Sequence, residues 1–461
     1  MRAGVPAGAR GHAADRDRGG VGGDDRAAAA RGRRLRLRPV LFPAGVAVHR
    51  RRARSGPQEP DQPSGYRDAR TARAAGARPV ILPPLALYVH MPWCVRKCPY
   101  CDFNSHALKS TRPDPAYVDA LLLDFEHELP ALRGRAIETV FFGGGTPSLF
   151  RPEQFAHLLA SLRRRAPFAA DAEITLEANP GTIERGQFAG YRDAGINRVS
   201  LGAQTFSRTA LSALGRIHSP EDTLRAVEEL RAANLDNFNL DLMYALPAQT
   251  PEQALYDVAA ACALRPAHIS HYQLTLEPGT VFHAQPPPLP DEDAAWAMQV
   301  DCQRELAGAG YAQYEVSAYA RAGARCRHNL NYWRFGDYVG IGAGAHGKIS
   351  MSVPGAIFRS AKPKMPRAYV ASLADPERSC GERTRIAESE LGFEFMLNAL
   401  RLNEGFTQAE FESRTGLALQ CIDAKLQNAA NRGLLERAAD RWRPTELGRR
   451  FLNDLQSGFL V

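Results

Sequence analysis

Between residues 85 and 276, short runs of β-branched and aromatic residues alternate with longer stretches in which apolar positions recur every three to four residues. The short runs predict strands and the longer stretches predict amphipathic helices. The predicted strands are Leu87–His90, Thr139–Phe142, Glu173–Glu177, Arg198–Leu201, Asn239–Met243 and His268–Leu276. The predicted helices between them include Asp114–Leu132, which begins with Asp114 as a capping residue, and Pro152–Arg165, Ser219–Asn234 and Pro251–Leu264.

Strands that alternate with helices in this way are typical of parallel βαβ units. Six such units fall short of the eight that close a (β/α)8 barrel. We therefore expect an α/β fold, a partial (β/α)6 barrel, with its reactive groups at the carboxyl ends of the strands.

The pattern changes after about residue 285. Pro286–Pro290 predicts a linker-like turn, Asp291–Gly310 a helix and Tyr314–Tyr319 a strand, and residues 327–347 are dense in aromatics and glycines. Near the end the order is helix, helix, hairpin and helix (Ile386–Leu400, Thr407–Arg414, Ala418–Gly433, Leu434–Pro444 and Thr445–Leu455). This order predicts a mainly helical, winged-helix-like C-terminal domain. We therefore divide the chain into an N-terminal extension (1–79), the barrel (80–285), a connecting region (286–382) and the C-terminal domain (383–461).

The charge of the chain is unevenly distributed. Residues 1–84 hold 18 arginines, no lysine and 7 acidic residues, whereas the rest holds 40 basic and 43 acidic residues. The basic whole-chain pI of about 9.1 therefore belongs to one segment and does not indicate a nucleic-acid partner. We expect residues 1–79 to carry no function, as a disordered tail, a stretch upstream of the true start or an Arg-rich presequence. The alternative, a binding module led by this basic segment, would be tested by deleting residues 1–79.

Two further classes of protein are excluded by composition. No window approaches the roughly 18 consecutive apolar residues of a membrane-spanning helix, so we expect no integral membrane segment. Eight cysteines in 461 residues are too few for a secreted disulfide scaffold. We expect a cytoplasmic protein.

The strongest chemical feature is a group of three cysteines, Cys94, Cys98 and Cys101, directly after the first predicted strand. Three thiolates on one tight loop can hold three irons of a [4Fe–4S] cluster and leave the fourth iron open to a small molecule. A zinc site with His90 or His106 as its fourth ligand is an alternative, because structural zinc needs four ligands. Three unrelated cysteines are the other alternative.

The spacing C-x3-C-x2-C, with Tyr100 before the last cysteine, resembles the radical SAM superfamily. The segments Leu87–Cys94, Cys98–Asn104 and Gly143–Ser148 resemble the oxygen-independent coproporphyrinogen III oxidases and, more closely, the radical SAM heme chaperones. The resemblance covers about Leu85 to the C-terminus. It implies that the open iron chelates S-adenosylmethionine (SAM), and that one electron from the reduced cluster cleaves the sulfonium to a 5′-deoxyadenosyl radical.

The resemblance also implies a set of SAM-binding residues near the ends of the predicted strands. Three glycines after the second strand would let backbone amides approach a ligand closely. A carboxylate at Glu177 could accept ribose hydroxyls, and an Arg216 fork matches a carboxylate. Asp241 is unusual inside a strand, although each of these acids could instead be structural. The candidate SAM residues are Tyr88, Tyr100, Gly144, Gly145, Thr146, Glu177, Gln204, Arg216 and Asp241.

One departure decides between the two resembling groups. The oxidases carry a fourth cysteine two residues after the third, and this chain has Phe103 there. Three ligands suffice for the cluster, but the missing thiol argues against decarboxylation of coproporphyrinogen. We expect a heme chaperone that passes heme to an acceptor protein, with an electron donor for its cluster. The alternative is an oxidase-type radical SAM decarboxylase, and no catalytic residue is assigned.

The segment His328–Trp333 matches the HNxxYW motif that the resemblance associates with heme binding. Imidazole is a common axial ligand of heme iron, and Tyr and Trp offer flat apolar contact to a macrocycle. The candidate heme residues are His328, Asn329, Tyr332 and Trp333. A packed structural histidine is the alternative, and Cys326 is a second candidate iron ligand. The nearby Gly340–His346 lacks the helix and the acid that a dinucleotide loop requires.

Overall fold

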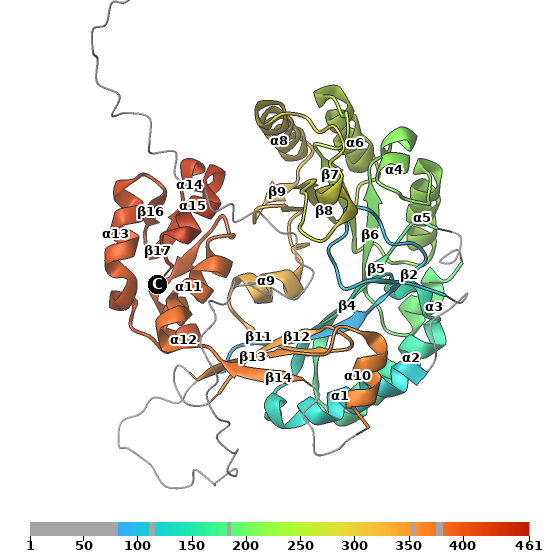
Figure 1. The fold of residues 1–461 in the computed structure, drawn as a ribbon, viewed down its shortest axis with the longest axis horizontal. Helices are drawn as coiled ribbons and strands as arrows, with labels where there is room; N and C mark the ends of the chain where they lie inside the picture. The colour runs from blue at the N-terminus through green and yellow to red at the C-terminus, as the bar shows by residue number, and fades with distance from the viewer. Residues whose placement is uncertain (1–81, 110–115, 182–185, 352–355, 375–380, 461) are drawn as a thin grey trace, which may run out of the picture. The chain divides into compact units, whose positions relative to one another are not determined.

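The computed structural model describes residues 82–460 apart from 110–115, 182–185, 352–355 and 375–380. A single large sheet runs through it in the order β14-β13-β12-β11-β1-β4-β5-β6-β7-β8-β10-β9 (Figure 1). The strands from β11 to β8 are mutually parallel, and the flanking strands are antiparallel. This arrangement confirms the predicted partial barrel.

All six predicted barrel strands are present and lie side by side in chain order: β1 (Leu85–Met91), β4 (Ile137–Gly144), β5 (Phe168–Ala178), β6 (Arg198–Gln204), β7 (Phe238–Tyr244) and β8 (His268–Gln273). A seventh parallel strand that the sequence pattern did not predict, β11 (Asp337–Ile341), pairs with the other edge of β1. The remaining strands of the sheet are β9 (Ala312–Gln313), β10 (Ala318–Ala320), β12 (His346–Ser350), β13 (Ile357–Ala361) and β14 (Glu382–Arg385).

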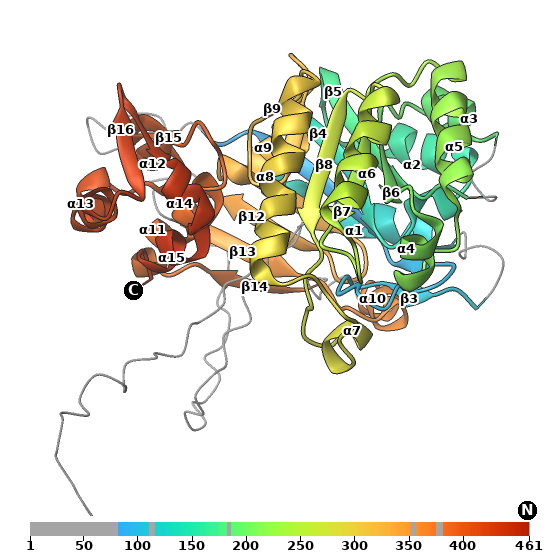
Figure 2. The same ribbon diagram turned by 90° about the horizontal axis from the view of Figure 1, so that it is seen from above.

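Helices cover the outside of the barrel, and α6 and α8 lie together beside β7 and β8 (Figure 2). The capping boxes of Ser219 and Thr250 begin α5 and α6, because each hydroxyl accepts from a backbone amide of the first turn. The helices up to the C-terminal domain are α1 (Ala116–Leu132), η1 (Pro147–Leu149), α2 (Pro152–Arg165), α3 (Phe188–Asp193), α4 (Arg208–Ala213), α5 (Pro220–Ala232), α6 (Pro251–Ala263), α7 (Val281–Ala284), α8 (Glu292–Gly308), α9 (Arg327–Trp333) and α10 (Pro366–Ser372).

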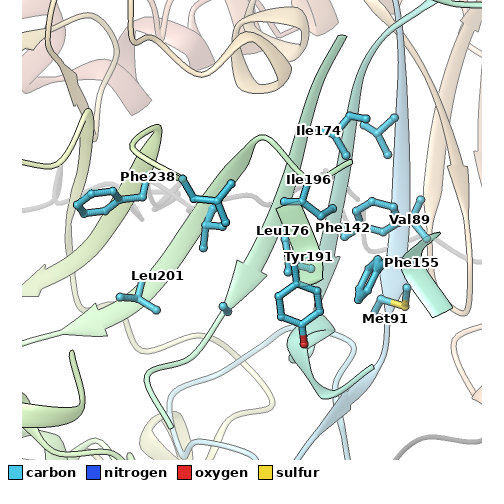
Figure 3. Packing of buried hydrophobic residues seen from close by; sticks show 14 of the residues in the cluster. Val89, Met91, Phe142, Phe155, Ile174, Leu176, Tyr191, Ile196, Leu201 and Phe238 are labelled. Carbon is cyan, nitrogen blue, oxygen red and sulfur yellow. The ribbon is translucent and has the colours of Figure 1, made fainter. Parts of the chain in front are cut away.

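The main hydrophobic core lies between the parallel strands and these helices (Figure 3). Phe142 on β4 meets Phe155 on α2 edge to face, with 5.0 Å between ring centroids, and Phe155 meets Tyr191 on α3 in the same way. Because outward-facing residues of each strand fill this core, the alternate residues face the interior of the barrel. Those inward positions carry the polar side chains described below.

The C-terminal elements form a second hydrophobic cluster of their own. A three-stranded sheet, β15-β17-β16, packs among helices (Figure 1), which confirms the winged-helix-like prediction. The predicted last helix is in fact two short helices. The elements are α11 (Glu388–Ala399), β15 (Phe406–Thr407), α12 (Gln408–Thr415), η2 (Leu419–Ile422), α13 (Asp423–Asn431), β16 (Leu435–Ala438), β17 (Arg441–Pro444), α14 (Glu446–Arg450) and α15 (Leu452–Ser457).

The predicted strand Tyr314–Tyr319 is wrong in extent, because residues 314–317 form the turn between β9 and β10. The extension 1–79 and the capping residue Asp114 lie outside the described residues, and the division into four segments stays a prediction. Within the described ranges, no helix combines the length and apolar character needed to cross a membrane.

Candidate functional site

A cleft opens into the barrel at the carboxyl ends of its strands, beside the cysteine loop. The loop leaves β1 through the short strand β2 (Trp93–Cys94), which pairs with β3 (His106–Ala107). Cys94, Cys98 and Cys101 all line the cleft and are free thiols. Phe103, which stands where the oxidases have a fourth cysteine, lines it as well.

The cysteine thiols have polar neighbours within the protein. Thr146 Oγ1 donates to Cys94 Sγ at 3.5 Å, and Arg216 Nη1 donates to Cys98 Sγ at 3.8 Å. Burial raises the pKa of the Cys101 thiol to about 11. The described residues contain no group of three His, Cys, Asp or Glu side chains placed to hold a single metal ion. The thiols of a four-iron cluster bind different irons and are not gathered round one point.

The glycine turn after β4 is held by packing within the protein. Gly144 has φ +114°, and a Cβ there would collide with the ring of His90. A Cβ on Gly145 would lie 2.5 Å from the Trp93 carbonyl oxygen. These glycines therefore let the β4 turn sit directly on the cysteine loop, and Gly144, Gly145 and Thr146 line the cleft.

Two half-buried carboxylates, Glu177 and Asp241, face the cleft from β5 and β7. Glu177 Oε2 accepts from the Gly144 amide at 3.1 Å. Burial, and after it the charge of Asp241, raise the pKa of Glu177 to about 8. Asp241 accepts from Ser200 and Asn239 at 3.0 and 2.8 Å, and burial raises its pKa too. A carboxyl with so high a pKa gains much from a cationic ligand.

Arg216 and Gln204 complete the mouth of the cleft. Arg216 Nη2 donates to the Gly202 carbonyl at 2.7 Å and to Asn179, while Asn179 Nδ2 donates to Thr146. Gln204 has φ +68° at a β-bulge, a conformation that costs about 1 kcal/mol or more in a residue with a side chain. Tyr272 donates to Gln204 Oε1 at 2.9 Å, which holds this amide toward the cleft.

The two tyrosines predicted to bind SAM differ in whether they line the cleft. Tyr100 lines the cleft next to the cysteines. Tyr88 is 1% exposed and does not line the cleft as described; its hydroxyl shares a 3.0 Å hydrogen bond with His90 Nδ1. The structure therefore brings eight of the nine predicted SAM residues to one cleft and places Tyr88 behind its wall.

The HNxxYW segment forms helix α9, which packs against β1, β4 and β11 on one side and against α11 on the other (Figure 1). Glu173 on β5 accepts from the amides of Arg327 and His328 and so caps the helix. Of the four candidate heme residues, Asn329 lines the cleft, whereas His328, Tyr332 and Trp333 do not line it as described.

His328 is 1% exposed, and both of its ring nitrogens are engaged. Nδ1 shares a 2.8 Å hydrogen bond with Thr139 Oγ1, and Nε2 shares one of 2.9 Å with the Tyr332 hydroxyl. Burial lowers the pKa of His328 to about 3, so the ring is neutral. As placed here, His328 has no nitrogen free for a heme iron. Cys326 is fully buried as well, and its thiol points to Glu173 Oε1 at 3.7 Å.

Several cleft residues were missed by the sequence reasoning. Asn179 follows Glu177 by two positions, so its place on the same strand end could have revealed it. Arg198, Ser200, Asn239 and Ser270 lie deeper in the barrel, where only the alternation along β6, β7 and β8 points to them.

The donor set fits the iron–sulfur cluster and SAM. Three free thiols stand on one loop. Next to them lie a guanidinium, Arg216, that complements a carboxylate, and a half-buried carboxyl, Glu177, that complements hydroxyls or a cation. The residues around His328 do not fit an axial heme ligand in the conformation described.

Two parts of this chain match known protein families. Residues 88–259 match the Radical SAM superfamily, and residues 386–451 match the HemN C-terminal domain. The solved structure of coproporphyrinogen III oxidase from Escherichia coli superposes with a TM-score of 0.70 and 23% identity, over 82% of this chain and 90% of that one. That likeness shows the fold alone.

The fold and the cysteine cleft thus define a radical SAM protein with a HemN-type C-terminal domain. The heme chaperone HemW of Escherichia coli is 48% identical over 382 residues, which are 83% of this chain and all of the relative. HemW of Haemophilus influenzae is 46% identical over 82% of this chain and 99% of that relative. The chain belongs to the HemW family of radical SAM heme chaperones.

Proposed function

We propose that this protein binds heme, carries a [4Fe–4S] cluster and SAM, and transfers heme to an acceptor protein in the cytoplasm. The observation that carries the proposal is the match to HemW over the relative's whole length. Phe103 in the cleft supports it, because a radical SAM oxidase of the coproporphyrinogen type would have a thiol there. A one-electron donor for the cluster is the second partner we propose.

We assign the cluster to Cys94, Cys98 and Cys101, the three free thiols of the loop. When bound, the cluster supplies an open iron that chelates SAM and an electron that can cleave it. The chain itself orients the ligand. Arg216 is fixed by the Gly202 carbonyl and Asn179 beside Cys98, where it can hold a carboxylate. Glu177 is aimed into the cleft by the Gly144 amide, where it can accept hydroxyls.

The heme-contacting residues stay a prediction, and the structure adds a condition to it. His328 must leave Thr139 or Tyr332 before a ring nitrogen can reach an iron. A shift of α9 would be required, since the helix is also tied to Glu173 on β5.

The test is an anaerobic titration of hemin into cluster-reconstituted protein, followed by the Soret band, with a coproporphyrinogen III decarboxylation assay alongside. We expect saturable binding and no decarboxylation. His328→Ala and Cys326→Ser probe the two candidate iron ligands, and His157→Ala, at an exposed position on α2, is the matched control. Absence of hemin binding together with decarboxylation would overturn the proposal and establish the oxidase instead.

A further inference from the structure

Arg198 is the first residue of β6, at the opposite end of the strand from Gln204. Arg198, Ser200, Gly202 and Gln204 alternate along β6 and all line the cleft. Six residues of strand span about 20 Å, so Arg198 lies at the floor of the cleft, far from the cysteine mouth. Its side chain is only 2% exposed. A guanidinium at such a depth requires a partner.

No direct partner is present for this guanidinium among the residues that the structure describes. Its Nε is buried without a hydrogen-bond partner, and no carboxylate there forms an ion pair with Arg198. The other buried lysines and arginines of the described residues are paired: Lys348 with Asp337, Lys362 with Asp124, and Arg401 with Glu315. Arg198 is therefore an exception that a structural role does not explain.

The two acids whose charges act on Arg198 are committed elsewhere. Glu173 accepts from the backbone amides of Arg327 and His328 and thereby caps α9. Asp241 accepts from Ser200 and Asn239. Both act on Arg198 only through longer-range electrostatics.

The other titratable groups near Arg198 do not neutralise its positive charge either. His268 shares hydrogen bonds with Asn239 and Tyr314, and burial, followed by the charge of Arg198, lowers its pKa. The charge of Arg198 lowers the pKa of His328 in the same way, after burial. The two histidines and the Cys326 thiol thus lie near enough for electrostatic interaction with Arg198, but within the described residues none of them forms an ion pair or hydrogen bond with it.

We propose that Arg198, at the floor of the cleft, binds a carboxylate group of a ligand that enters the barrel. The planar fork of arginine matches a carboxylate, and a charge-assisted hydrogen bond in so dry a place is strong. Asn239, Ser270 and Asn329 also line the cleft and bring polar groups to it. This subsite is separate from Arg216, which serves the mouth of the cleft.

The inference rests on the proposed function in one respect, that the cleft admits one of the ligands named there. Heme has two carboxylates at one edge and is the expected source, because the single carboxylate of SAM is assigned to Arg216; binding of the SAM carboxylate at Arg198 instead is the alternative outcome. Two pairs of probes distinguish these sources. The first pair is hemin and hemin dimethyl ester, and the second is SAM and decarboxylated SAM.

The experiment measures the dissociation constants of all four probes with cluster-reconstituted wild type, Arg198→Gln and Arg198→Lys. We expect the wild type to prefer hemin to its dimethyl ester by tenfold or more, since a charged hydrogen bond is worth that much. In Arg198→Gln that preference should fall to near unity, while Arg198→Lys should retain part of it. Arg208→Gln, at an exposed arginine on α4, should behave as wild type.

The outcomes separate this inference from the proposed function. If hemin does not bind at all, the heme proposal fails, and the SAM pair alone decides the role of Arg198. If the acid-to-ester and acid-to-decarboxylated ratios are the same in wild type and both variants, the carboxylate subsite is wrong. Should Arg198→Gln lose its cluster or its folded circular dichroism, the charge-conserving Arg198→Lys still decides, because it keeps the charge and loses the fork.

Discussion

At the scale of single residues, Glu177 links the pKa of one carboxyl to ligand binding. Burial and Asp241 raise its pKa to about 8, so it is mostly protonated at neutral pH without a ligand. If the ionised form accepts the ribose hydroxyls of SAM, binding must release a proton. The affinity for SAM should then rise about tenfold between pH 7 and pH 9, measured by calorimetry on reconstituted, unreduced protein.

The folding stability that Glu177 contributes changes with pH in the opposite direction to the affinity for SAM. The pKa of Glu177 is higher in the folded protein than the ordinary value of 4.5, so its contribution to stability is full below about pH 4.5 and is lost as the pH rises through about 8. Glu177→Gln should flatten the pH profile of SAM affinity, whereas Glu153→Gln on α2 should leave it intact. A wild-type affinity that does not change with pH would show that ionised Glu177 is not the acceptor.

Gly144 provides a second prediction at this scale. Gly144→Ala should destabilise the protein by about 2–4 kcal/mol. The new Cβ would collide with the His90 ring, and the backbone φ of +114° disfavours any residue with a side chain. Gly134 also has positive φ, +70°, but a Cβ added there would have nothing within 4 Å, so Gly134→Ala isolates the conformational cost of about 1 kcal/mol. Urea unfolding of the two variants checks the difference, and equal losses would remove the role of the His90 contact.

At the scale of elements, α9 is the least expected feature. The six barrel strands follow from period-two patterns and β-branched residues, which act locally. The strand Asp337–Ile341 was not predicted, because its partner strand β1 lies about 250 residues earlier in the chain. Helix α9 could not be predicted from its local sequence, because Glu173 on the distant strand β5 caps it, whereas the adjacent N-cap residue Cys326 forms no capping hydrogen bond with its side chain. Arg198 could not be recognised as a cleft residue for the same reason. Its lack of a hydrogen-bond partner depends on the bonds that neighbouring residues form with other groups.

Helix α9 should depend on the buried ring of His328 for its stability. His328→Ala should lower the free energy of unfolding by about 2–4 kcal/mol even without heme or cluster, because it removes a buried ring and leaves Thr139 and Tyr332 without their partner. Chemical denaturation of the apoprotein measures this loss, with exposed His157→Ala as the control. An apoprotein of unchanged stability would mean that His328 is not held as described and is free to serve a ligand.

At the scale of the whole molecule, Arg401 connects three parts of the described chain. It follows α11, its guanidinium lies 4.2 Å from the centre of the Trp333 ring on α9, and Nη2 pairs with Glu315 Oε2 at 3.1 Å. Both members of the ion pair are buried, at 9% and 3% side-chain exposure. The C-terminal domain is thereby joined to α9, the helix that contributes Asn329 to the lining of the cleft.

Removal of one partner from a buried ion pair leaves the other charge uncompensated, at a cost of about 3–5 kcal/mol. Arg401→Ala should therefore destabilise the protein strongly in thermal unfolding, while Arg450→Ala, which removes an exposed guanidinium stacked on the half-buried Trp296, should cost about 1 kcal/mol or less. Addition of Glu315→Gln to Arg401→Ala should recover part of the loss, because the neutral amide can still accept from Ser317. The double variant could instead be less stable than Arg401→Ala by the full amount that Glu315→Gln costs alone. The two residues would then not be energetically coupled, and this ion pair would not connect the C-terminal domain to α9.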